Sequence, residues 1–195
     1  MSQPNFLQVE RSLGASVAWC SAHPSTPSAK AYGPSLAVMQ PAFETVKLET
    51  NVTYNAWRSR YGEELRAFKR LRLVIEATRE LADEHAIDGC PERSILYTER
   101  AEIHGLAEET IAFLAPHAEQ WPWIARQTTE MRRQMAQSDA DQAASEAAYA
   151  TYTVSVKRRV GIYAEAVALL NEFLDESRSD APGDPGLAAA AYNRA

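Results

Sequence analysis

Residues 149–174 read YATYTVSVKRRVGIYAEAVALLNEFL, and this stretch decides the fold. Its large apolar side chains recur at steps of three or four residues, at Tyr149, Tyr152, Val156, Val160, Tyr163, Val167, Leu170 and Leu174. An α-helix has 3.6 residues per turn, so side chains at these intervals lie along one face. The pattern therefore predicts a long helix with one apolar face, as in helical bundles and coiled coils.

The helix that contains this stretch has no internal proline between Pro122 and Arg178. A continuous helix over about 57 residues would reach about 85 Å. The alternative is a break at residues 138–141, where Ser-Asp-Ala-Asp forms a weak capping pattern. Residues 136–148 are rich in alanine, so we expect close helix approach or weak packing there.

Two further helices precede this one. The first begins at Asn55, a good N-cap residue, and we expect it to end near Asp88–Gly89. The second begins at Pro91 beside Glu92 and ends at Pro116. Their apolar stripes are Trp57, Tyr61, Leu65, Phe68, Leu71 and Ile75 in the first, and Ile95, Ile103, Leu106, Ile111 and Leu114 in the second.

The chain before Asn55 reads differently. Residues 45–54 place β-branched and apolar residues at positions of one parity, which favours a strand. The alternative is that this stretch extends the following helix backwards. Residues 23–30 contain two prolines among small polar residues, so we expect an irregular arm with short extended pieces at most.

These observations predict a mainly α protein: an elongated antiparallel three- or four-helix bundle with a long C-terminal helix. The expected division is an irregular, partly β N-terminal arm over residues 1–41, a helical bundle over 42–178 and a flexible tail over 179–195.

The composition of the chain argues against several classes of protein. The net charge is −6, which argues against nucleic acid as the main partner. The two cysteines, Cys20 and Cys90, are too few and too far apart for a disulfide framework or a metal motif. No apolar run is long enough to span a bilayer and no secretory signal begins the chain, so we expect a cytoplasmic protein without membrane insertion.

No motif indicates catalysis, a metal or a cofactor. Di-iron bundles need a Glu three residues before a His, and that pattern is missing. Glu102 and His104 point apart on a helix and do not share a metal. Cys90 just before a helix N-terminus is the one candidate nucleophile, and we expect it to be structural.

Two basic clusters and two tryptophans are the candidate interaction residues. The clusters include Arg66, Lys69 and Arg70 in one helix, and Lys157, Arg158 and Arg159 in another. Such clusters bind phosphate backbones, pair with acidic helix faces or remain solvated. Trp121 and Trp123 flank Pro122 and either anchor a partner or cap the end of the bundle, and the aromatic stripes form core or interface.

We therefore expect a non-enzymatic structural or adaptor protein. It self-assembles as a homo-oligomer or docks on protein partners, through its helix faces and its N-terminal arm. Two alternatives remain: a small-molecule-binding helical protein or enzyme, and a nucleic-acid-associated protein that uses the basic clusters.

Overall fold

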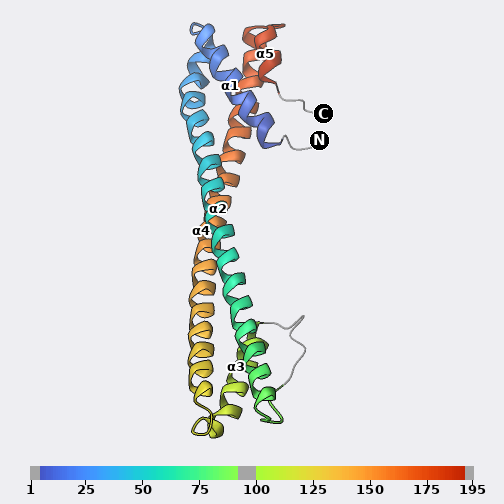
Figure 1. Cartoon of the computed structure of the whole chain (residues 1–195). Coiled ribbons are helices and arrows are strands. Elements are labelled where there is room, and N and C mark those ends of the chain that lie inside the picture. The colour runs from blue at the N-terminus through green and yellow to red at the C-terminus, as the bar shows by residue number, and fades with distance from the viewer. Residues whose placement is uncertain (1–4, 92–99, 192–195) are drawn as a thin grey trace. The chain divides into compact units, whose positions relative to one another are not determined.

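The computed structural model describes residues 5–91 and 100–191, and this part of the chain is mainly helical. Its helices are α1 (Phe6–Ala22), α2 (Pro27–Glu84), α3 (Arg100–Leu114), the 3-10 turn η2 (Ala115–His117), α4 (Pro122–Asp180) and α5 (Pro185–Ala190) (Figure 1). None of the described residues is in a β-strand. Over the same residues, no helix has both the length and the apolar character needed to cross a bilayer.

The chain forms two compact units. Unit 1 contains Met1–Tyr54 and Ala150–Ala195, and unit 2 contains Asn55–Tyr149. The two long helices, α2 and α4, each contribute one part to either unit. The domain boundaries expected at residues 41 and 178 stay predictions.

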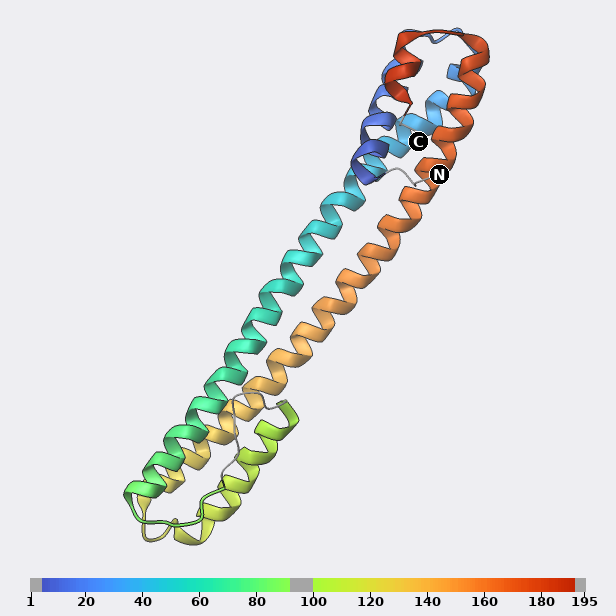
Figure 2. The ribbon, with the colours of Figure 1, turned by 90° about the vertical axis from the view of Figure 1, so that its right-hand side faces the viewer.

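Unit 1 packs α1, α5 and parts of α2 and α4 around one core (Figures 1 and 2). Leu36 and Phe43 of α2 are fully buried in it, as are Leu170 and Phe173 of α4. The buried members are Val9, Leu13, Trp19, Cys20, Ala29, Leu36, Phe43, Ala166, Leu170, Phe173, Leu174, Leu187 and Ala190. Because this core is drawn from four helices, residues 6–41 pack together with the rest of the unit.

Polar contacts fix the helix ends of unit 1. A carboxylate oxygen of Asp180 accepts a hydrogen bond from the Ser28 backbone N–H at 2.7 Å, which satisfies a free donor at the start of α2. The Ser12 hydroxyl of α1 donates to the Ala190 carbonyl of α5. Asp184 caps α5 by accepting from the Gly186 N–H at 2.6 Å. The first of these bonds joins α4 to the start of α2, and the second joins α1 to α5.

Unit 2 packs α3 against α2 and α4 (Figure 2). Its larger core cluster contains Leu71, Ile75, Ile103, Leu106, Ala107 and Met131, all fully buried. A second cluster, of Ala82, Ile87, Leu114 and Ile124, lies beside the turn that enters α4. The apolar stripe expected over residues 57–75 thus supplies core residues in its second half.

The strand expected over residues 45–54 is wrong, because these residues continue α2. Val46 and Thr50, four residues apart, are buried, with 1% and 5% of their surface exposed. Leu48 and Val52, also four apart, are 64% and 68% exposed. One buried and one exposed stripe of the helix therefore both fall on even-numbered positions, and this alternation resembles that of a strand.

The irregular, partly β arm is not what the structure shows either, because α1 and the start of α2 occupy the region. Pro24 lies in the turn between them, and Pro27 is the first residue of α2, where a missing N–H removes no helical bond. Pro34 and Pro41 lie inside α2. Burial of Leu36 and Phe43 beside them offsets the lost backbone bonds.

One helix end differs from the expectation. α2 stops at Glu84 instead of near Gly89, with Ala86 in the left-handed region at φ 54° and the Ile87 N–H bonded to the Ala82 carbonyl at 3.0 Å. This is a Schellman-type ending. The next helix was expected to begin at Pro91, which is not in a helix, and Glu92 and Ile95 lie outside the described residues. α4 continues through Ser138, whose side chain is buried instead of capping a break.

Candidate interaction surface

The feature of unit 1 that its fold leaves unexplained is the side of α2 that points away from the core. Val38, Leu48 and Val52 are 72%, 64% and 68% exposed there. Ala31, Pro34 and Pro41 lie on the same side and are also exposed. We call these six residues (Ala31, Pro34, Val38, Pro41, Leu48 and Val52) the outward face of α2.

Regular spacing makes these residues one surface. The steps between them are three, four, three, seven and four residues, so their side chains follow one line along the helix. The opposite side of the same segment holds the fully buried Leu36 and Phe43. A helix that is apolar on two opposite faces is typical of one that makes contacts on both, whereas an ordinary surface helix is polar outside.

The charge pattern reinforces this interpretation. Residues 31–43, AYGPSLAVMQPAF, contain no charged side chain. Over more than three helical turns, α2 thus lacks the charges that normally cover the solvent side of a helix. Large exposed apolar patches on folded proteins mark interaction sites more often than isolated apolar residues do.

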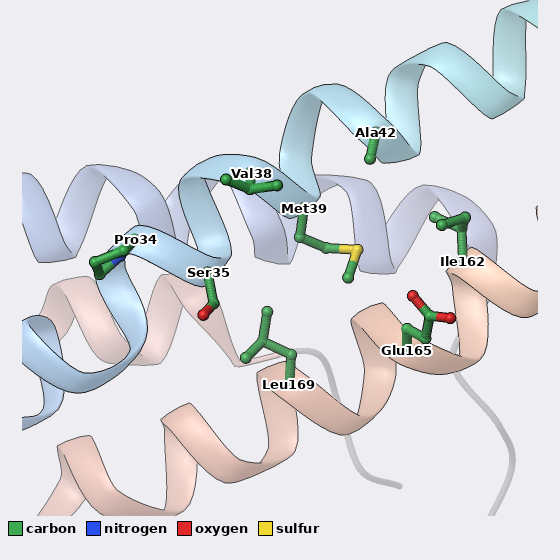
Figure 3. A pocket seen from close by; sticks show the side chains of 8 residues that line it. All are labelled: Pro34, Ser35, Val38, Met39, Ala42, Ile162, Glu165 and Leu169. Carbon is green, nitrogen blue, oxygen red and sulfur yellow. The ribbon is translucent and has the colours of Figure 1, made fainter.

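A groove of about 660 Å³ borders the outward face, between α2 and α4 of unit 1 (Figure 3). Met39 and Leu169 project into it, and Val38 stands at its edge (Figure 3). Its lining consists of Pro34, Ser35, Val38, Met39, Ala42, Ile162, Glu165 and Leu169. Glu165 is its one charged group, so the groove is suited to an apolar side chain rather than a charged ligand.

The basic cluster at residues 157–159 is largely engaged within unit 1. Arg158 donates to both carboxylate oxygens of Glu49, at 3.1 and 2.9 Å. The Arg159 guanidinium lies 4.0 Å from the centre of the Phe6 ring, which itself stacks on Phe43. A cation over an aromatic face is attracted by the ring quadrupole. Lys157 alone of the three is exposed without a polar partner.

The basic cluster at residues 66–70 is more exposed to solvent. Arg66, Lys69 and Arg70 of α2 are exposed in unit 2 and make no ion pair within the described residues. Leu65 and Leu73, which flank these three residues in the sequence, are 49% and 59% exposed. This part of α2 therefore presents a basic surface with an exposed leucine on either side.

Trp121 and Trp123 pack beside the end of α2 and the start of α4, in unit 2. Their rings lie 4.5 and 5.3 Å from the ring of His85, and both pack against the cluster that contains Ile124. Both side chains are half-buried. Cys90 packs against the same cluster, and burial raises the pKa of its thiol, which disfavours the nucleophilic thiolate.

One polar cluster, where α3 meets α4, is not apparent from the sequence. His104 Nε2 lies 3.4 Å from the Ser138 hydroxyl, and His104 Nδ1 lies 3.9 Å from an Asp139 oxygen. Arg100 donates to that same oxygen at 2.7 Å. Burial is the main cause that lowers the pKa of His104, and the Asp139 carboxylate opposes it. Because His104 and Ser138 are 34 residues apart, spacing alone does not reveal the pair.

The residue types of this cluster match a hydrolytic triad, but the geometry does not support that chemistry. Ser138 is fully buried, so a substrate has no access to its hydroxyl. It also lies inside a continuous helix, where backbone N–H groups are bonded to carbonyls and unavailable to an oxyanion. The cluster is best interpreted as a polar contact between helices.

Over residues 5–91 and 100–191, no three His, Cys, Asp or Glu side chains are grouped so as to hold a metal ion. Comparison with protein-family models, with curated proteins and with solved structures finds no match to this chain.

Proposed function

We propose that the protein is a non-enzymatic structural or adaptor protein that associates with protein chains through the outward face of α2. The observation that carries the proposal is the exposed apolar side of α2, at Val38, Leu48 and Val52, opposite a fully buried side of the same helix. The antiparallel bundle expected from the sequence would give this face a rigid support.

The N-terminal arm has a smaller part in this proposal than the sequence suggested. Val9 and Leu13 of α1 are fully buried in unit 1, so their side chains are already used within the chain. The proposal therefore rests on helix faces, and a homo-oligomer is the assembly it favours.

The test is the mass in solution, measured by light scattering over a concentration series. We expect the protein to exceed its monomer mass of 21.6 kDa, and Val38→Glu to return it to that mass. Val154→Glu is the matched control, because Val154 is 67% exposed on α4 and lies outside the outward face. A monomeric wild type at every concentration would contradict the proposal.

A second candidate function is nucleic-acid binding through Arg66, Lys69 and Arg70, which are exposed and make no ion pair with any residue that the structure describes. Binding of this kind weakens steeply with salt. A mobility-shift assay at low salt, with the triple glutamine variant as the control, tests it; an unshifted nucleic acid removes it.

A further inference from the structure

Two charges bracket the uncharged part of α2. Lys30 precedes residues 31–43 and Glu44 follows them, and both side chains are exposed. Neither has an ion pair or a hydrogen bond from its side chain in the described part of the chain. The uncharged segment 31–43 thus has one unpaired positive charge at its start and one unpaired negative charge at its end.

The two charges lie on the same line of the helix. Lys30, Ala37 and Glu44 are spaced by seven residues, and seven residues return an α-helix to within about 20° of its starting direction. The separation of Lys30 and Glu44 along the axis is about 21 Å at 1.5 Å per residue. Ala37, also exposed, lies midway between them.

When two copies of this helix run antiparallel, the charges of one are complementary to the charges of the other. We infer that the part of the outward face that lies between Lys30 and Glu44 binds the same segment of a second copy, in an antiparallel pair with its two-fold axis at Ala37. Lys30 of each copy then lies opposite Glu44 of the other, and the uncharged segments pack between the two ion pairs. A two-fold contact of one patch with itself closes as a dimer.

Other arrangements fit the charges less well. A parallel pair would place Lys30 beside Lys30 and Glu44 beside Glu44, which repel each other. An uncharged partner would leave both charges unpaired at the rim of an apolar contact. The small side chain of Ala37 at the centre permits the two helices to approach closely. The inference rests on the proposed function and adds the identity and direction of the partner.

Charge reversal gives the sharpest test. Lys30→Glu and Glu44→Lys each convert two attractive pairs into two repulsive ones, so we expect each variant alone to dimerise tenfold to hundredfold more weakly, as an order of magnitude. An equimolar mixture of the two variants restores both attractions and is expected to form a heterodimer of near wild-type affinity. Both are measured by sedimentation velocity at low salt.

Control variants distinguish a wrong pairing direction from a wrong proposed function. Arg11→Glu reverses another exposed charge of unit 1, on α1, and is expected to leave dimerisation unchanged. If the wild type associates and Val38→Glu abolishes this, but the mixture stays as weak as either variant alone, the antiparallel pairing is wrong and the proposed function stands. If the wild type is monomeric throughout, the proposed function itself fails. Equal denaturation midpoints of all variants show that each one folds.

Discussion

Truncating Val46 and Leu48 to alanine should have very different effects on folding stability, although the two residues are only two positions apart. Val46 is 1% exposed and Leu48 is 64% exposed, because they lie on opposite sides of α2. Val46→Ala removes two carbons from the core, at about 0.8 kcal/mol each, and leaves a small cavity. We expect a loss of about 2 kcal/mol in the free energy of unfolding.

Leu48→Ala removes a larger side chain, but one that is mostly in water in both states. We expect a change below about 0.5 kcal/mol, as for most surface substitutions. The assay is urea denaturation followed by circular dichroism, at a protein concentration low enough that association adds nothing to stability. In a strand, residues two positions apart share a face. Equal losses in the two variants would therefore refute the helical assignment.

Three further predictions concern single side chains. Ala86→Gly should stabilise the protein by about 1 kcal/mol in thermal denaturation, because Ala86 has a φ of 54° that glycine adopts without strain; a lower melting temperature would contradict this ending of α2. Phe173→Ala should destabilise it by about 3–5 kcal/mol, because the ring is fully buried against Trp19; a loss below 1 kcal/mol would contradict the core of unit 1. The third concerns His104, whose pKa is lower in the folded chain than its ordinary value of 6.5. As the pH falls below 6.5, His104 therefore binds a proton in the unfolded chain before it does so in the folded chain, and this favours unfolding. Stability should therefore decline from that pH down through the folded pKa, and urea midpoints of His104→Gln should show a smaller decline; an equal decline would exclude His104.

The long helices were predictable where apolar spacing had a single interpretation. The stripe over residues 149–174 indicated α4, and Leu170 and Leu174 of that stripe are indeed buried. Val160 belongs to the same stripe but is 61% exposed. Periodicity indicates which residues share a face of the helix, but it does not indicate how far neighbouring helices cover that face. Proline was the other source of error, since Pro34 and Pro41 lie inside a helix whose other side is held by core contacts.

The outward face of α2 was harder to predict from the sequence. Val46, Leu48 and Val52 are all apolar, but only the packing shows that the first faces the core and the other two face outward. The charges of Lys30 and Glu44 acquire meaning only once residues 27–44 are known to be one continuous helix. The contact of His104 with Ser138 required the arrangement of α3 and α4.

The most direct test of the account is a cross-link at the centre of the inferred dimer. In an antiparallel pair with its axis at Ala37, this residue lies opposite its own copy, within reach of a disulfide bond. The Ala37→Cys variant, mildly oxidised and run on a non-reducing gel, should form a covalent dimer rapidly, whereas Val154→Cys, on the exposed side of α4, should not. Cross-linking of Ala37→Cys no faster than that of Val154→Cys would contradict the claim that the outward face of α2 binds a second copy.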